Sequence, residues 1–278
     1  MKLSGFAIIK NAIHNDYPIV EAIQSILPVV DEMIVLVGDS KDDTRSLIAS
    51  IGSEKIKIFD SVWDYNLRTG GTVLSVETNK ALKLIDPEST WAFYIQGDEV
   101  VHEKYLDNVK KACLRYKDDL NVDGLLFDYT HFYANYNYVG VSRMLYPKEV
   151  RIIRNHPKIQ SYKDAQGFRI GEAKIKVKKI AASIYHYGWV KTPIQMRKKI
   201  NEVTQYWHQD SEEYRKAVAE IKPFEFETYL SVKEFKGTHP AVLQARIAEQ
   251  ALTQEIDNRK NTISFKDRIL LGIEQITG

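Results

Sequence analysis

The sequence predicts an α/β fold, in which helices flank a mostly parallel sheet and a helical extension follows at the C-terminal end. Three observations lead to this prediction. The 278 residues are 44% hydrophobic and 27% charged, a globular composition that excludes disordered, collagen-like and disulfide-stabilised chains. Over the first hundred residues, short apolar runs alternate with stretches of helical spacing, which is typical of parallel strands joined by right-handed crossovers. From about residue 191 onward the apolar spacing is helical.

Four apolar runs in the first hundred residues are predicted to be strands. They are residues 6–10, 33–37, 55–59 and 91–96. Helices are expected between them, over residues 18–27, 44–51 and 73–84. Pro18 favours a helix start, Asp42 or Asp43 can cap the second helix, and Gly52 ends it.

Beyond residue 100 the pattern changes to strands joined by long loops. A helix is predicted over residues 103–116, and strands over 124–129, 149–154 and 174–183. The loop 129–138 carries Phe132, Tyr133, Tyr136 and Tyr138. Such rings can stack on the faces of sugars, as in an acceptor subsite, but core packing is their commoner use, and both interpretations stay open. Trp207 and His208 have the same two interpretations.

The C-terminal part is predicted to consist of helices over residues 193–210, 211–219 and 240–259, followed by an amphipathic stretch, 265–276. We therefore expect an α/β domain over residues 1–190 and a helical extension over 191–278 that packs on it. The single cysteine, Cys113, indicates a reducing compartment, and no apolar run is long enough for a signal peptide or a membrane span. A cytoplasmic protein is expected, either wholly soluble or peripheral at the inner face of the cell membrane through its last helix.

The net charge of +2 conceals an uneven distribution. Residues 141–200 contain 15 Lys and Arg against 3 Asp and Glu, whereas the rest of the chain contains 24 against 34. This excludes uniform basicity and predicts one basic region that faces an anionic ligand, although a solvated face rich in lysine is an equally simple explanation.

Polar turns follow three of the predicted strands, where ligands bind in an open parallel sheet. They are Lys10-Asn11-Ala12, Gly38-Asp39-Ser40 and Gln96-Gly97-Asp98-Glu99. No GxGxxG sequence follows the first strand and no GxxxxGK[ST] sequence occurs, which excludes dinucleotide and P-loop sites. A carboxylate in the last turn can bind Mg²⁺ or Mn²⁺ against a diphosphate, or Asp98 can simply cap the next helix.

The order of residues 6–11, 27–32, 37–44 and 91–99 resembles a family-2 glycosyltransferase of the GT-A fold, over roughly residues 3–190. Residues 37–44 resemble the family's nucleotide-binding turn, and Gln96 to Asp98 resemble its DxD motif. The resemblance implies a UDP- or GDP-sugar donor, a Mn²⁺ or Mg²⁺ ion, and inverting transfer to the hydroxyl of a saccharide or another acceptor. Many members build bacterial surface polysaccharides.

The resemblance also implies roles for individual residues. Asp39 would contact the nucleobase or ribose, with Lys10, Asn11 and Gly97 beside the donor. Asp98 would bind the metal ion, and His186, in Tyr185-His186-Tyr187-Gly188-Trp189, would be a second ligand or a structural histidine. Gln96 replaces the first aspartate of the motif, so it can hydrogen-bond a ribose hydroxyl but brings no charge.

An inverting transfer needs a general base, and three carboxylates lie between residues 141 and 173. Asp164 is the first choice, because Lys163 and Arg169 should keep it ionised; Glu149 is the second. Asp164 can equally be a loop residue paired with Arg169. Positive charge for the diphosphate can come from a set of four side chains: Lys80, Arg151, Arg154 and Arg169.

Two other classes of protein remain as alternatives. A sugar-phosphate nucleotidyltransferase shares the sheet and the metal, but residues 10–16 lack the Gly-rich basic signature expected after its first strand. A non-catalytic relative that binds anions or nucleic acid through residues 141–200 would show steep salt dependence and no need for metal. Nucleic acid is not expected as a partner of the preferred function.

Overall fold

The structure is a computed structural model that describes residues 1–67, 69–142, 144–208, 212, 215–216, 222–226 and 231–250. The predicted helix over 211–219 lies mostly outside these residues, and the stretch 265–276 lies wholly outside them. Of the helix predicted over 240–259, the part beyond residue 250 is outside as well. No helix in the described part of the chain is long and apolar enough to cross a membrane.

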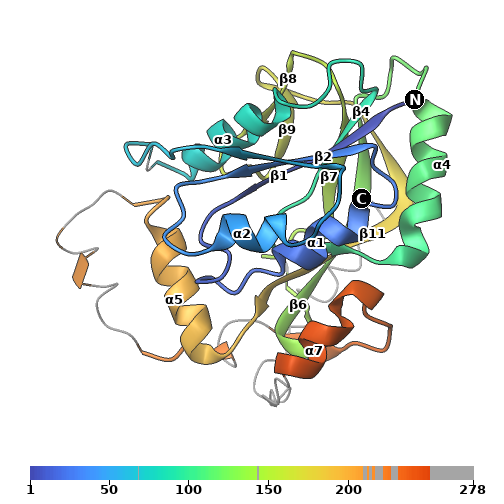
Figure 1. The fold of residues 1–278 in the computed structure, drawn as a ribbon. Coiled ribbons are helices and arrows are strands. Elements are labelled where there is room, and N and C mark those ends of the chain that lie inside the picture. Colours follow the sequence, from blue (N-terminus) through green and yellow to red (C-terminus); the bar gives the residue numbers. More distant parts are fainter. Residues whose placement is uncertain are drawn as a thin grey trace.

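A large sheet runs through the centre of the molecule in the order β3-β2-β1-β4-β7-β6-β11-β5, with β12 paired to β6 (Figure 1). The strands are β1 (Leu3–Ile9), β2 (Glu32–Val37), β3 (Ile56–Asp60), β4 (Trp91–Tyr94), β5 (Glu99–Val101), β6 (Gly124–Gly140), β7 (Lys148–Arg154), β11 (Val177–Val190) and β12 (Val232–Glu234). The strands β3, β2, β1 and β4 are parallel, and β6 is parallel to β11. The prediction of an α/β fold with a largely parallel sheet is confirmed.

The first strand is apolar throughout because both of its faces are covered. Leu3, Ala7 and Ile9 lie in one buried cluster, and Phe6 and Ile8 lie in another. Alternate side chains of a strand point to opposite faces, so each face of the sheet has its own core. The predicted strand over 6–10 is thus confirmed, with its start moved to Leu3.

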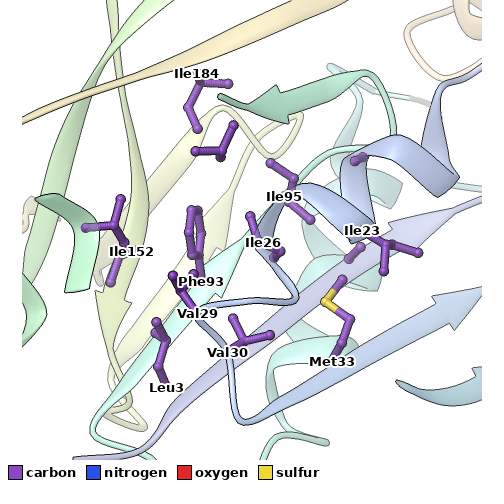
Figure 2. Packing of buried hydrophobic residues seen from close by; sticks show 14 of the residues in the cluster. Leu3, Ile23, Ile26, Val29, Val30, Met33, Phe93, Ile95, Ile152 and Ile184 are labelled. Carbon is purple, nitrogen blue, oxygen red and sulfur yellow. The ribbon is translucent and has the colours of Figure 1, made fainter. Parts of the chain in front are cut away.

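Helices α1 (Ile19–Ile26), α2 (Thr44–Ala49) and α4 (Leu106–Tyr116) cover one face, since their buried side chains belong to the cluster of Leu3 and Ala7. Helix α3 (Thr72–Leu82) covers the other, through Val73 and Ala81. Figure 1 shows α3 on the opposite side of the sheet from α1 and α2. Figure 2 shows Ile23 and Ile26 of α1 beside Met33 of β2. A short 3₁₀ turn, η1 (Glu103–Tyr105), precedes α4, where a single helix is predicted.

The second half differs from the prediction. Residues 129–138 are not a loop but part of β6, which continues for 17 residues. Phe132 and Tyr136 pack against Tyr187 of β11 in a buried cluster, so these rings belong to the core. The strand predicted over 174–183 is two elements, β10 (Ala173–Lys174) and β11.

A small three-stranded sheet, β10-β9-β8, was not predicted. It pairs β8 (Ile159–Tyr162) with β9 (Gly167–Ile170) as an antiparallel hairpin. Ile159 and Phe168 pack in the same cluster as Val73 of α3. This contact places the tip of the hairpin, residues 163–166, close to the end of β1.

The described part of the chain beyond residue 190 contains α5 (Pro193–Thr204), β12, a 3₁₀ turn η3 (Ala241–Leu243) and α7 (Gln244–Gln250). Thr192 and Gln195 form a capping box at the start of α5. This part contains a strand as well as helices, because β12 extends the sheet at β6. Arg246 of α7 forms an ion pair with Asp16 of the loop after β1. The division of the chain at residue 190 stays a prediction.

Candidate functional site

A cavity of about 270 Å³ opens at the carboxyl ends of β1 and β4. In the sheet, β2 lies on one side of β1 and β4 lies on its other side. The cavity therefore lies where the strand order reverses. In open α/β sheets this is where ligands bind. Its walls are the ends of β1 and β4, the hairpin tip at Asp164 to Gln166, and the last turns of α5 with Tyr206 and Trp207.

Unpaired polar atoms are concentrated in this cavity. Among the described residues, four buried side-chain atoms have no hydrogen-bond partner, and three of them belong to cavity-lining residues: Asn15 Oδ1, Trp63 Nε1 and Asp164 Oδ1. Buried polar atoms are nearly always paired in folded proteins, because an unpaired one costs roughly 1–3 kcal/mol. These three atoms, one donor and two acceptors, are the unpaired polar groups of the residues that line the cavity.

Asp98 lies in the floor of the cavity, in the turn after β4. Its Oδ2 accepts a hydrogen bond from Lys199 Nζ at 3.0 Å and lies 3.4 Å from His186 Nε2. Burial favours the protonated acid, but the charges of Lys199 and His186 outweigh it and hold the pKa of Asp98 well below its usual value. Gly188 permits this approach, because a Cβ there would lie 2.4 Å from Asp98 Oδ2.

His131 of β6 fixes the orientation of the His186 ring. The two residues are opposite each other in the β6–β11 register, and their Nδ1 atoms are 3.2 Å apart. The Tyr146 carbonyl oxygen can only accept, so His131 Nε2, at 3.0 Å, carries the hydrogen. Burial and the neighbouring His186 lower the pKa of His131 to about 3, so its Nδ1 is an acceptor for His186. With His131 accepting, His186 donates through Nδ1, and its Nε2 faces Asp98 Oδ2.

Asp98 and His186 fit a divalent cation that also binds a ligand. Because Mg²⁺ lies about 2.1 Å from each ligand atom, two donor atoms 3.4 Å apart can share one ion. A His whose other nitrogen is held by a hydrogen bond is the usual form of a metal-binding histidine. No group of three or more His, Cys, Asp or Glu suited to a metal occurs in the described ranges. The remaining ligands would have to be substrate oxygens and water, which is common for Mg²⁺.

Arg151 also lines the cavity, but its charge is used within the protein. The guanidinium donates to Glu99 through Nη2 at 2.6 Å and through Nε at 2.9 and 3.0 Å, and through Nη1 to Glu149 at 3.2 Å. Tyr129 donates to the same Glu99 carboxylate at 2.5 Å. Two carboxylates thus hold the guanidinium, and the expectation that Arg151 supplies charge to a diphosphate stays a prediction.

Replacing Glu149 by glutamine tests the charge balance of this group. Burial raises the pKa of Glu149 to about 7, against the partial compensation of Arg151. The pKa of Glu149 is higher in the folded state than in the unfolded state. Its contribution to the free energy of unfolding is therefore fully present below about pH 4.5, and it is lost as the pH rises through 7. Glu149→Gln mimics the protonated acid, so it should unfold with a free energy up to about 3 kcal/mol larger than wild type at pH 8. Urea unfolding at pH 4 and pH 8 measures this, and an equal difference at both would contradict it.

Asp164 projects from the tip of the β8–β9 hairpin into the cavity. Lys163 and Ala165, on either side of it, have φ angles of 54° and 62°, left-handed values that tighten the turn. Burial raises the pKa of Asp164, and Lys163 only partly opposes this. Arg169 instead donates to the Tyr162 hydroxyl. The predicted role of Arg169, in holding Asp164 ionised or in pairing with it, is therefore wrong.

Gly71 lies behind Asp164, and its substitution should disturb the cavity. The residue has φ of 70°, and an added Cβ would lie 2.5 Å from Asp164 Cβ and 3.0 Å from the Trp207 ring. We expect Gly71→Ala to lose about 1 kcal/mol of stability from backbone strain and to weaken ligand binding by displacing Asp164.

Gly70→Ala is the matched control for Gly71→Ala. Gly70 has φ of 58° and nothing within 4 Å of an added Cβ. It should show the strain alone, measured by thermal unfolding, with unchanged binding measured by calorimetry. If both variants bound the ligand equally well, Gly71 would have no influence on the site.

The other predicted site residues divide into two groups. Lys10, Gln96 and Gly97 line the cavity with Asp98, Asp164 and Arg151. His186 touches this set through Asp98.

The remaining predicted residues do not line the cavity. Asp39 lies in a neighbouring hollow of about 400 Å³ and is joined to the cavity by Lys10, whose Nζ is 2.6 Å from Asp39 Oδ1. Asn11 donates to Glu202, and Lys80 pairs with Glu77 on its own helix. Arg154 donates to main-chain carbonyls, including that of Lys117. Lys80 and Arg154 thus bind other groups of the protein, and their contact with the diphosphate stays a prediction.

Sequence reasoning missed four residues of the site and its support: Asn15, Trp63, His131 and Lys199. His131 could have been found by pairing it with His186, had the aromatic stretch been assigned to a strand. The helical spacing of α5 does not separate Lys199 from its exposed neighbour Lys198. Trp207 lines the cavity and also packs against the cluster of Val73, so both of its interpretations stay open. His208 lines an adjoining hollow.

No protein-family model matches the chain, and no curated protein matches it. Among solved structures it is similar to TarS from S. aureus, with a TM-score of 0.42 and 18% identity over 78% of this chain and 41% of that chain. Residues 1–349 of TarS in complex with UDP-GlcNAc give the same TM-score and identity, over 69% of that chain. The chain thus spans less than half the length of this TarS chain.

Two further solved structures are similar. One is the 4-diphosphocytidyl-2C-methyl-D-erythritol synthase of Anaerococcus prevotii, with a TM-score of 0.43, 14% identity, and coverage of 74% of this chain and 95% of that chain. The other is glucosyl-3-phosphoglycerate synthase of Mycobacterium tuberculosis with Mn²⁺, UDP and phosphoglyceric acid, with a TM-score of 0.33, 18% identity, and coverage of 47% and 43%. The neighbours include glycosyltransferases of the GT-A fold, the family that the sequence resembles.

Proposed function

We propose that the protein is a glycosyltransferase that moves a sugar from a nucleotide-diphosphate-sugar to a hydroxyl acceptor. The observation that carries this proposal is the cavity at the ends of β1 and β4. It combines unpaired polar atoms with Asp98 and His186 at the point of an α/β sheet where nucleotides bind. A cavity of this kind, with a few convergent polar groups, is the usual form of a small-molecule site.

The donor lies with its nucleoside toward Asp39 and its diphosphate toward Asp98. Lys10 stands between the two hollows, so its neighbourhood suits the ribose. Asn11, Gln96 and Gly97 are placed beside it, and the amide of Gln96 can hydrogen-bond a hydroxyl there. Trp63 offers its unpaired Nε1–H, and Tyr206 packs at 5.4 Å from the Trp63 ring to form an aromatic wall.

Asp98 and His186 hold the divalent cation, Mn²⁺ or Mg²⁺, that accompanies the donor. Bound there, the ion supplies positive charge to the leaving diphosphate. His131 positions His186 for this role, and Gly188 leaves room for both side chains. The first position of the DxD-like motif, Gln96, contributes no charge, so Asp98 is the carboxylate in this pair.

Asp164 acts as the general base of an inverting transfer. Its Oδ1 is buried without a partner, so it can accept the proton of an acceptor hydroxyl that enters the cavity. The acceptor oxygen then bonds to the anomeric carbon, and the bond from that carbon to the diphosphate oxygen breaks. The nucleoside diphosphate leaves, and Asp164 keeps the proton until solvent removes it. Burial favours this role because it raises the pKa of the carboxyl.

The acceptor lies on the side of α5, where a second hollow of about 340 Å³ shares Lys199, Val203 and Trp207 with the donor cavity. The rings of Trp189 and Trp207 give it an aromatic lining that suits a saccharide. Synthesis of a surface polysaccharide, by a cytoplasmic enzyme or one bound at the inner face of the membrane, is the setting in which we place this transfer.

A panel of UDP-, GDP-, CDP- and ADP-sugars, tested by thermal unfolding with and without Mn²⁺, examines the proposal. One donor should raise Tm, because a ligand that binds the native state stabilises it. With that donor, release of the nucleoside diphosphate identifies glycosyl transfer. Release of pyrophosphate from a nucleoside triphosphate and a sugar phosphate would identify a nucleotidyltransferase instead. No shift with any nucleotide would refute both.

A further inference from the structure

The ammonium group of Lys199 occupies the position next to Asp98 that faces the cavity. Its Nζ donates to Asp98 Oδ2 at 3.0 Å and to the Gly188 carbonyl oxygen at 2.9 Å, and it lies 4.8 Å from the centre of the Tyr17 ring. The side chain is 15% exposed and that of Asp98 is 13% exposed. The same carboxylate oxygen thus faces both Lys199 and His186.

This ion pair must open before a cation can bind at Asp98 and His186. A partly buried carboxylate that loses its partner is left with an uncompensated charge, and so is the lysine. A cation arriving alone would displace Lys199 without offering it a new partner. Its affinity is therefore reduced by the free energy of the Asp98–Lys199 pair.

A diphosphate changes this balance, because its oxygens offer Lys199 a new partner. Lys199 borders both the donor cavity and the adjoining hollow, so its flexible four-carbon stem can turn toward a ligand in either. Lys10 and Arg151 border the donor cavity too, but Lys10 is paired with Asp39 on the nucleoside side and Arg151 is held by Glu99 within the fold. Lys199 is paired with a carboxylate that itself faces the ligand.

We propose that Lys199 is a built-in counter-ion of Asp98, which keeps the divalent cation from binding alone and releases Asp98 when a nucleoside diphosphate enters. The inference rests on the proposed function in two respects, the cation site at Asp98 and His186 and the identity of the anion. The cation and the nucleotide then bind with positive coupling, each raising the affinity for the other by the same factor.

Titration of the protein with Mn²⁺, followed by the electron paramagnetic resonance signal of the free ion, tests this proposal. The variant Lys199→Met should bind Mn²⁺ alone about tenfold more tightly than wild type. Lys198→Met, which removes an adjacent exposed lysine from the same helix, should bind like wild type. Lys199→Arg keeps the charge and should retain the weak affinity. The double variant with Lys199→Met and Asp98→Asn should lose the increase in Mn²⁺ affinity.

The same titration is repeated with UDP as the probe. In wild type UDP should raise the affinity for Mn²⁺ about tenfold, and in Lys199→Met the increase should be smaller. If Lys199→Met binds Mn²⁺ no more tightly than wild type, the inference is overturned. If it binds more tightly but UDP changes nothing in any variant, the counter-ion role is supported and binding of UDP at the proposed nucleotide site is contradicted.

Discussion

Replacing Asp164 by asparagine is expected to lower the rate of sugar transfer by roughly 10²–10⁴-fold while donor binding stays near the wild-type value. The amide has nearly the same shape as the carboxyl group but cannot accept the proton of the acceptor hydroxyl. Glu172→Gln is the control, because it neutralises an exposed carboxylate just beyond the same hairpin. Steady-state transfer rates and calorimetric titration of the donor measure the two effects separately.

The pH dependence of the wild-type rate adds a second observation on Asp164. The base must be ionised to act, and burial raises its pKa above the ordinary value of 3.8. The rate should therefore fall as the pH drops through that raised pKa, and the acid limb should be absent from the residual activity of Asp164→Asn. Full transfer activity in Asp164→Asn would assign the base elsewhere, with Glu149 as the next carboxylate to examine.

Replacing Glu99 by glutamine should destabilise the protein by about 3–5 kcal/mol, the usual cost of removing one partner of a buried ion pair. Glu99 is fully buried and accepts three hydrogen bonds from Arg151 and one from Tyr129. Without it, Arg151 keeps only Glu149 as a charged partner. Urea unfolding measures the loss.

The matched control for Glu99→Gln is Asp60→Asn. It breaks the pair with Arg45, whose two side chains are 55% and 68% exposed, so the free energy of unfolding should change by less than about 1 kcal/mol. If Glu99→Gln lowered the free energy of unfolding by a similarly small amount, the buried pair of Glu99 and Arg151 would not stabilise the fold below the cavity. Since β5 and β7 carry this pair, its loss should also reduce donor affinity.

The sequence was sufficient to predict the elements whose signals are local. The apolar runs of β1 and β2 stand out because both sheet faces are buried, and Pro18 and Gly52 mark helix ends by their own backbone preferences. The turn after β4 followed from the same pattern, and it does place Gln96, Gly97 and Asp98 in the cavity.

Features that depend on contacts between distant parts of the chain could not be predicted from local sequence patterns. The stretch around Tyr136 contains polar residues typical of loops, yet it is a strand because β11 and β12 pair with it. Arg151 and Lys199 are indistinguishable as charges in the basic region 141–200. Only their partners, Glu99 and Asp98, separate a structural cation from one that faces the ligand.

The uneven charge therefore describes the site less directly than the sequence suggested. Arg151, Arg154 and Arg169 all donate to groups within the protein, and the lysine that faces Asp98 lies at the end of the basic region. Of the three negative groups that were predicted for the site, Asp98 and Asp164 line the cavity, whereas Asp39 lies in the neighbouring hollow.

Calorimetric titration of UDP, in the presence of Mn²⁺, tests the central claim that the cavity between β1, β4 and α5 binds the nucleotide. Val203→Trp places a large ring in this cavity, and Ile194→Trp places the same ring at a position of α5 that is 53% exposed. Wild type and Ile194→Trp should bind UDP with equal Kd, and Val203→Trp should bind at least about tenfold more weakly. Unchanged binding in Val203→Trp, or no binding of UDP, GDP, CDP or ADP by wild type, would contradict the account.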